Sequence, residues 1–140
     1  MNWLAWALLS AFFAGLTAVL AKVGVAGVDS TLATAIRTSV VLLFTWALFF
    51  ALTPARSLRL LDSRNWLFLI LSGLATGLSW VCYFRALQLG EASRVAPIDK
   101  LSVVFVIAFA ALILHERLTW HHWAGGLLIV VGAAILAVKG

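Results

Sequence analysis

The sequence predicts an all-α integral membrane protein that crosses the bilayer with five helices. Its 140 residues are 64% hydrophobic and only 11% charged, and a soluble domain of this size could not hide that much apolar surface. Crossing a hydrocarbon core about 30 Å thick takes roughly 20 apolar residues in a helix. Four stretches of about that length carry no Asp, Glu, Lys or Arg, and a fifth carries only a few: 1–21, 38–55, 65–84, 118–138 and, as the fifth, 94–114.

The first two helices are predicted at about residues 3–22 and 31–52. Lys22 ends the first helix and is its one charged residue. The turn at residues 23–30 contains glycines and an aspartate, which favour a change of chain direction. The second helix carries Arg37 nearly two turns inside its start. A charged side chain at that depth is a candidate for function.

The remaining three helices are predicted at about residues 65–89, 94–115 and 123–138. The longest polar connection, 53–64, precedes the third helix. Pro97 is expected in the first turn of the fourth helix, where a missing N–H is tolerated. All turns are short, so the whole chain, 1–140, is predicted to form a single membrane domain that crosses the inner cell membrane several times.

The charge distribution argues against a nucleic-acid-binding protein, and the cysteine count argues against a disulfide-bonded one. The net charge of +5 comes from basic residues scattered at helix ends, and no solvated basic face exists to bind a nucleic acid. The one cysteine, Cys82, excludes an intramolecular disulfide. The predicted partners are therefore the lipid bilayer and a small molecule.

Helices joined by short turns must alternate in direction, so residues near helix ends sort onto two sides. One side collects the tryptophans expected of an interfacial belt: Trp3, Trp6, Trp66, Trp120 and Trp123. The loop cations are nearly balanced, with Arg56, Arg59, Arg64 and Arg117 on that side and Lys22, Arg94 and Lys139 on the other. Because the positive-inside rule then favours neither orientation, the chain could insert both ways.

Several short motifs, in their order and spacing, resemble the EamA repeat of the drug/metabolite transporter superfamily. They are an aromatic residue followed by Arg-Ala-Leu, a Gly-x-Ala-Ser turn, a helix-4 proline, a Glu-x-Leu-Thr turn, spaced glycines in the last helix, an Ala-x-x-Ala-Lys-x-Gly ending of the first helix, and an arginine in the second. The residues are Tyr83, Arg85, Ala86, Leu87, Gly90, Ala92, Ser93, Pro97, Glu116, Leu118, Thr119, Gly125, Gly132, Ala18, Ala21, Lys22, Gly24 and Arg37. The resemblance implies export or uptake of small polar metabolites by alternating access between inverted halves.

The chain departs from the family pattern in two ways. Many members carry a second proline in the fourth helix, about where Val103 stands here. Typical members also contain two repeats in opposite orientations, whereas this sequence contains one. We therefore expect an antiparallel homodimer, or pairing with a separately encoded half-transporter. The competing prediction is a non-transporting membrane subunit that pairs with another membrane protein and stabilises it.

Five charged residues are predicted to gather at one membrane surface: Lys22, Arg37, Arg85, Asp99 and Lys100. Four are positive and one is negative, and a low-dielectric site with that imbalance attracts anions. The predicted substrate is therefore an anionic or zwitterionic metabolite. For Lys100, a snorkelling anchor is about as good an interpretation. The carboxylate of Asp99 needs a partner, which Lys22, Arg37 or Arg85 could supply.

Trp80 and Tyr83 complete the candidate substrate-binding residues. Both lie on the third helix at the depth of a central cavity. An aromatic residue there more often packs than contacts a ligand, but the family resemblance favours contact with the apolar part of the substrate.

The sequence predicts no catalytic residues, no cofactor and no metal site. His121 and His122 are adjacent and would point apart on a helix, and with His115 they lack further ligands at a suitable spacing. No Ser/His/Asp arrangement, phosphate loop or pair of carboxylates indicates an enzyme. The first helix has no acidic residue, on which the four-helix multidrug exporters rely, so proton-coupled export of lipophilic cations is not expected.

Overall fold

The computed structural model describes residues 2–54 and 61–138, and these residues form α-helices and no strand. The helices are α1 (Trp3–Gly24), α2 (Ser30–Leu52), α3 (Ser63–Leu89), α4 (Ala92–Asp99), α5 (Ser102–Leu112) and α6 (Trp120–Ala137). The fourth candidate membrane span, Ala92–Leu112, comprises α4 and α5, so five helical spans are long and apolar enough to cross a bilayer. The prediction of an all-α, five-span protein is confirmed. Arg56, Arg59 and Lys139 lie outside the described residues.

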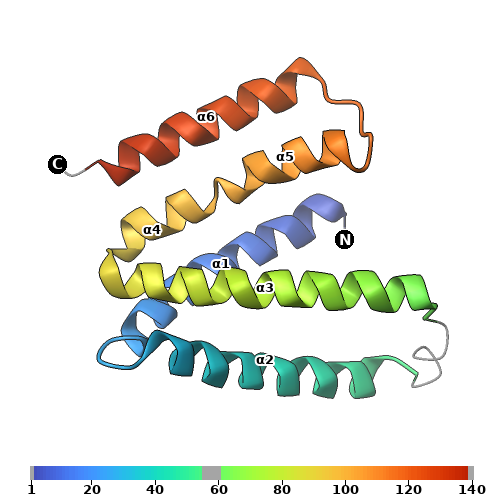
Figure 1. Ribbon diagram of the computed structural model, residues 1–140, viewed down its shortest axis with the longest axis vertical. Helices are drawn as coiled ribbons and strands as arrows, with labels where there is room; N and C mark the ends of the chain where they lie inside the picture. The colour runs from blue at the N-terminus through green and yellow to red at the C-terminus, as the bar shows by residue number, and fades with distance from the viewer. Residues whose placement is uncertain (1, 55–60, 139–140) are drawn as a thin grey trace. The chain divides into compact units, whose positions relative to one another are not determined.

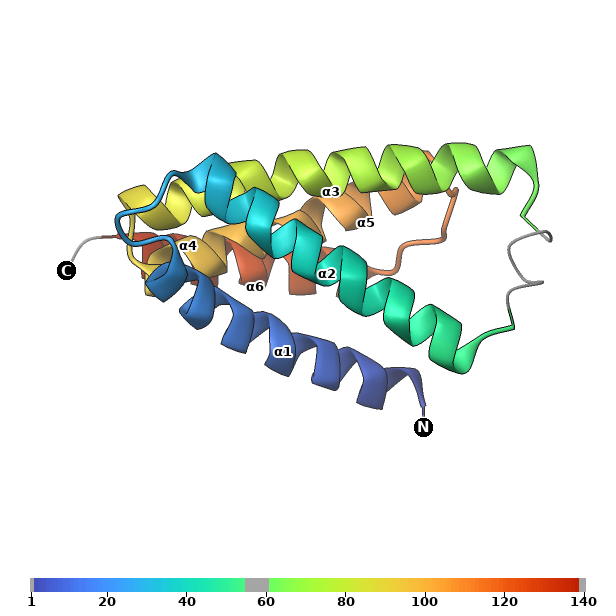
Figure 2. The same cartoon turned by 90° about the horizontal axis from the view of Figure 1, so that it is seen from below.

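The chain divides into two compact units, which are described separately. The hairpin unit consists of residues 24–88 and contains α2 and α3. The two helices run antiparallel; they are closest near the start of α2 and diverge toward the connection between Pro54 and Leu61 (Figures 1 and 2). At the close end, the side-chain amide of Gln88 donates to the carbonyl of Val28. This bond fixes the register of the hairpin where the helices meet.

Aspartates start both helices of the hairpin unit. The Asp29 carboxylate precedes α2 and accepts hydrogen bonds from the backbone N–H groups of Thr31 and Leu32, at 2.9 and 3.0 Å. Asp62 precedes α3 in the same way and accepts from the N–H of Asn65 at 2.7 Å. A carboxylate in this position satisfies orphan donors and complements the positive end of the helix dipole.

The four-helix unit joins residues 1–23 to 89–140 and contains α1, α4, α5 and α6. In it, α6 runs back along α4 and α5 and packs on both (Figure 1). The helix begins at Trp120, three residues before the predicted start, because Thr119 and His122 form a capping box. Here the Nδ1 atom of His122 takes the place of the more usual glutamate and accepts from the Thr119 N–H at 3.1 Å.

The fourth predicted span, about 94–115, consists of two helices in the structure, because the helix is interrupted at Lys100 and Leu101. The first helix of the pair starts at Ala92, so Pro97 lies inside α4 rather than in its first turn. A proline there has no N–H to donate and its ring crowds the carbonyl four residues back. The Lys100 N–H is shared between the carbonyls of Ala96 and Pro97, at 3.3 and 3.1 Å, and the Leu101 N–H bonds to a carbonyl three residues back, that of Ile98, at 3.0 Å. The joint forms just before Val103, the position at which the family resemblance led us to look for a second proline.

The span also ends earlier than predicted, at Leu112 rather than at His115. His115 has a φ of 52°, in the left-handed region that few residues other than glycine adopt. The Glu116 N–H then bonds to the carbonyl of Ala110 at 3.1 Å. The chain thus turns back on itself and leads into α6.

Large apolar side chains cover the outside of the described structure. The buried residues are few, and apart from Val25, Phe84 and Leu87 they are small: Ala18, Ser30, Thr34, Ala110, Gly126 and Ala133. In contrast, Phe44 is 62% exposed and Leu128 is 72% exposed. A surface this apolar is stable only in contact with hydrocarbon, which fits a multi-pass membrane protein.

Candidate functional site

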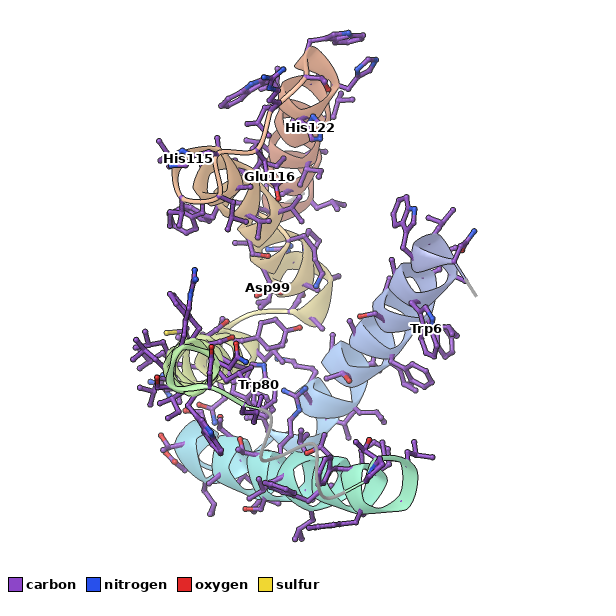
Figure 3. All side chains as sticks on the ribbon, turned by 90° about the vertical axis from the view of Figure 1, so that its right-hand side faces the viewer. Trp6, Trp80, Asp99, His115, Glu116 and His122 are labelled. Carbon is purple, nitrogen blue, oxygen red and sulfur yellow. The ribbon has the colours of Figure 1, made fainter. Side chains whose placement is uncertain are left out.

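Arg37 and two aromatic residues form the most distinctive cluster of the hairpin unit. The guanidinium carbon of Arg37 lies 4.4 Å from the centre of the Trp80 ring and 5.5 Å from that of Phe84. Trp80 lies between α3 and α2 in Figure 3. Such contacts contribute roughly 2 kcal/mol when they are shielded from water. They therefore help to hold a charged group on a membrane-spanning helix.

Helical spacing explains why these residues meet. On α2, Ser30, Thr34 and Arg37 follow at intervals of four and three residues and share one face. On α3, Trp80 and Phe84 are four residues apart and likewise share a face. Arg37 lies about 10 Å along the axis from the start of α2. The cluster is therefore well inside the span rather than at its end.

The threonine hydroxyls beside Arg37 bond within their own helix. Thr34 donates to the carbonyl of Ser30 at 2.7 Å, and Thr38 donates to that of Thr34 at 2.8 Å. Bonds of this kind satisfy hydroxyl donors in an apolar environment. They leave the Arg37 guanidinium as the main polar donor on this face of α2.

The acidic residues of the hairpin unit are used elsewhere. Residues 24–88 contain two, Asp29 and Asp62. Both carboxylates accept backbone hydrogen bonds at helix starts. Within the described part of this unit, the charge of Arg37 thus faces aromatic rings rather than a carboxylate. An anion that reaches Arg37 would supply the counter-charge.

Tyr83 and Arg85 occupy the same region of α3. Tyr83 lies close enough to interact electrostatically with Arg37, and its ring meets that of Phe84 edge-on. Arg85 is exposed and donates from Nη1 to the side-chain oxygen of Gln88 at 3.0 Å. Since Gln88 also binds the Val28 carbonyl, Arg85 supports the closed end of the hairpin.

The other three predicted site residues belong to the four-helix unit. The Lys22 ammonium donates to the carbonyl of Gly90 at 2.8 Å. Asp99 forms an ion pair with its neighbour Lys100, with Nζ and Oδ2 3.4 Å apart. The predicted partners of Asp99 were Lys22, Arg37 or Arg85, whereas the described ion pair joins Asp99 to Lys100. Glu91 pairs with Arg94 at 3.2 Å in the turn before.

Sequence reasoning missed Phe84, Gln88 and the Gly90 carbonyl. Phe84 could have been found, because it follows Trp80 by one helical interval. The role of Gln88 depends on the helix register, which the sequence does not encode in any simple pattern. A backbone carbonyl has no sequence signal, because nearly every position offers one.

The histidines show no metal-binding arrangement in the described part of the chain, where no three His, Cys, Asp or Glu side chains gather. His122 uses Nδ1 for the α6 cap, and the His121 ring contacts that of Trp120 in a tilted arrangement, with ring centres 4.0 Å apart. Figure 3 places His115 and Glu116 on the turn between α5 and α6.

An apolar pocket of about 220 Å³ lies between α5 and α6. Its lining is Val104, Ile107, Ala108, His122, Trp123, Gly126, Leu127 and Val130. No charged residue borders it, so it offers no counter-charge for an ionic ligand. Its mostly apolar lining is compatible with lipid acyl chains.

Comparison with known proteins identifies the family of this chain. The model of the EamA-like transporter family matches residues 1–138. The chain belongs to the EamA-like transporter family. This confirms the resemblance seen in its short motifs, and it makes the protein a member of a transporter family.

Two relatives carry names that bear on this EamA-like protein. The chain is 54% identical over 137 residues to an uncharacterized transporter in the cobO 3′ region of Sinorhizobium sp., covering 98% of this chain and 97% of the relative. It is 31% identical over 68 residues to a probable 4-amino-4-deoxy-L-arabinose-phosphoundecaprenol flippase subunit, ArnE, of Aeromonas salmonicida, covering 49% of this chain and 60% of the relative. No solved structure matches the chain.

Proposed function

We propose that this EamA-like protein moves small metabolites with an anionic or zwitterionic group across the cell membrane by alternating access. The contact of Arg37 with Trp80 and Phe84 carries the proposal. A guanidinium stays charged at any physiological pH and binds carboxylate or phosphate through paired hydrogen bonds. The substrate's anionic group binds Arg37, while its apolar part contacts Trp80 and Tyr83.

The charge distribution along the chain supports an anionic substrate. Because five spans joined by short turns are expected to alternate in direction, we expect the end of α1, the ends of the hairpin unit near Val28 and Gln88, and the first half of the fourth span to face one membrane surface. Lys22 and Arg85 lie near the ends of α1 and α3, and Asp99 and Lys100 lie in the first half of the fourth span, where α4 ends. Asp99 and Lys100 pair with each other, so their charges cancel. Of these four residues, Lys22 and Arg85 then contribute net positive charge to this surface, which attracts anions.

The functional unit in this proposal contains two copies in opposite orientations. Alternating access between inverted halves needs two repeats, and this sequence supplies one. The Sinorhizobium transporter, matched over 97% of its own length, also has the length of a single repeat. An identical chain inserted the other way round is the simplest second half.

A second candidate function is that of a subunit that works only with a different membrane protein. The name of the Aeromonas relative, a flippase subunit, favours it. The substrate in that name contains a phosphate joined to a long apolar chain. The phosphate could bind the Arg37 guanidinium, and the apolar chain could contact the aromatic rings beside it. In this case the partner is a second, distinct half rather than another copy of the chain.

Flux through proteoliposomes made from this chain alone tests the proposal. A panel of labelled anionic, zwitterionic and cationic metabolites is offered, with phenyl phosphate and benzyltrimethylammonium as competing probes of opposite charge. We expect uptake of anionic or zwitterionic compounds that phenyl phosphate inhibits and benzyltrimethylammonium does not. Uptake of cations alone contradicts the proposal. No uptake by this chain, but uptake after a second membrane protein is added, supports the subunit function instead.

A further inference from the structure

Lys22 is bound to the backbone of a distant turn. It is the one charged residue of α1, and its ammonium donates to the carbonyl of Gly90 at 2.8 Å. Both residues belong to the four-helix unit. Gly90 lies between the end of α3 at Leu89 and the start of α4 at Ala92. This hydrogen bond therefore ties the last turn of α1 to the turn that leads into α4.

The Gly90 carbonyl attracts a cation but binds it less strongly than an anion would. It follows directly on the C-terminal end of α3, where the helix dipole places partial negative charge. The carbonyl itself is neutral, however. Hydrogen bonds between an ammonium and an ionised acceptor are shorter and about twice as strong as those between neutral groups. A carboxylate or phosphate that arrives at Lys22 can displace the carbonyl.

A neighbouring ion pair provides an internal comparison. Glu91 is next to Gly90, but its carboxylate pairs with Arg94 at 3.2 Å within the same turn. The bond from Lys22 connects two elements, whereas the Glu91–Arg94 pair connects residues three positions apart. Removing the Arg94 charge should thus disturb the turn without releasing α1.

We propose that Lys22 is a positioning residue that latches α1 to the turn at residues 89–91, and that an anionic substrate opens the latch. The substrate's anionic group first takes the Lys22 ammonium from the Gly90 carbonyl, before it binds Arg37, and α1 becomes free to move away from the start of α4. This inference rests on the proposed transport of anions. It adds a reason why binding of the right substrate, and not of a cation, starts the conformational change.

The test follows the accessibility of the turn in the full-length protein. A cysteine reporter replaces the first residue of α4, Ala92→Cys, in a Cys82→Ser background, and a water-soluble maleimide measures its labelling rate in proteoliposomes. Without anion, Lys22→Met should raise the rate about tenfold, and Lys22→Arg should keep the parent rate. Phenyl phosphate should raise the rate in the parent and in Lys22→Arg, but not further in Lys22→Met. Benzyltrimethylammonium should change none of them.

Matched controls separate a latch from a general loosening of the turn. Arg94→Met should label at nearly the parent rate and keep its response to phenyl phosphate. The latch is overturned if Lys22→Met labels at the parent rate, if Arg94→Met raises labelling equally, or if phenyl phosphate leaves the parent reporter unchanged. The last measurement needs no substitution at Lys22, so it decides the matter even if Lys22→Met does not fold.

Failure of the latch and failure of the proposed function have different signatures. If proteoliposomes carry no anion, the proposed function fails and the opening step fails with it. If anions are carried but labelling of the parent does not respond to them, only the latch is overturned.

Discussion

Arg37 illustrates how a single residue can combine structural cost and function. A charged group inside a membrane helix is costly, and here Trp80 and Phe84 offset part of that cost. Arg64 has similar chemistry at the start of α3, with its guanidinium 5.9 Å from the Phe68 ring. Arg64 is the second residue of that helix, so its side chain can extend to the membrane–water interface and keep its charge in water. We therefore propose Arg37 as the anion-binding residue and interpret Arg64 as an interfacial anchor.

Gly27 is the residue whose backbone most clearly needs glycine. Its φ of 73° is in the left-handed region, where a Cβ costs about 1 kcal/mol or more. We expect Gly27→Ala to lower the unfolding temperature in detergent. Gly24→Ala is the matched control, since Gly24 ends α1 without a positive φ and a Cβ there meets nothing within 4 Å. Equal unfolding temperatures for the two variants would show that the turn does not need the left-handed conformation.

The residues of the candidate site were partly predictable. Arg37 was singled out because a charged group at membrane depth is costly, and Trp80 and Tyr83 were singled out because the family resemblance favours aromatic contact with the substrate. Their mutual approach depends on the register of two antiparallel helices, which the Gln88–Val28 bond fixes and which the sequence does not reveal. The bond from Lys22 to a backbone oxygen was beyond sequence reasoning for the same reason.

At the scale of elements, hydropathy predicted the five membrane spans but did not predict the interruption of the fourth span between α4 and α5. Five apolar stretches predicted five spans, because a bilayer demands length and apolarity from every crossing helix. The break after α4 was missed because the helix was predicted to start at Arg94. The actual N-cap is Glu91, which moves Pro97 from the first turn to the interior. A shift of two residues thus turns a tolerated proline into a helix breaker.

Restoring the missing N–H should strengthen the fourth span. We expect Pro97→Ala to raise the free energy of unfolding by about 1 kcal/mol, because the Ser93 carbonyl regains its helical donor. Transport should slow several-fold, since the joint at Lys100 and Leu101 becomes more helical. Pro54→Ala is the control, because Pro54 lies outside any helix. Thermal unfolding in detergent and flux in liposomes measure the two effects. A less stable Pro97→Ala protein with normal flux would mean that the joint has another cause.

At the scale of the whole molecule, location in the membrane explains why the surface is apolar, but it does not determine which partner the chain pairs with. The large apolar side chains that a soluble protein would bury are exposed on these helices. This follows from composition, and it was predicted. How one repeat builds a pathway depends on what covers these surfaces in the membrane. The family pattern and the balanced loop charges are the grounds for an inverted pair.

Fixing the orientation of the chain should abolish its activity if two opposed copies are needed. Two lysines added to the connection between Pro54 and Asp62 should bias every molecule to one orientation under the positive-inside rule. We expect a singly expressed variant of this kind to lose transport. Coexpression with a variant biased the other way should restore it. Cysteine accessibility measures orientation, and full activity from a uniformly oriented population would favour a parallel dimer or a different partner.

The measurement that tests the account most directly is anion flux in proteoliposomes of Arg37→Gln, compared with Arg64→Gln. Removing a charged hydrogen-bonding partner of an anion costs about 1.5–3 kcal/mol, which is roughly a tenfold to hundredfold rise in KM. The account predicts a loss of that size for Arg37→Gln, inhibition by phenyl phosphate that weakens in parallel, and nearly unchanged flux for Arg64→Gln. Unchanged KM and inhibition in Arg37→Gln, with the protein still folded, would contradict the anion-binding role of Arg37.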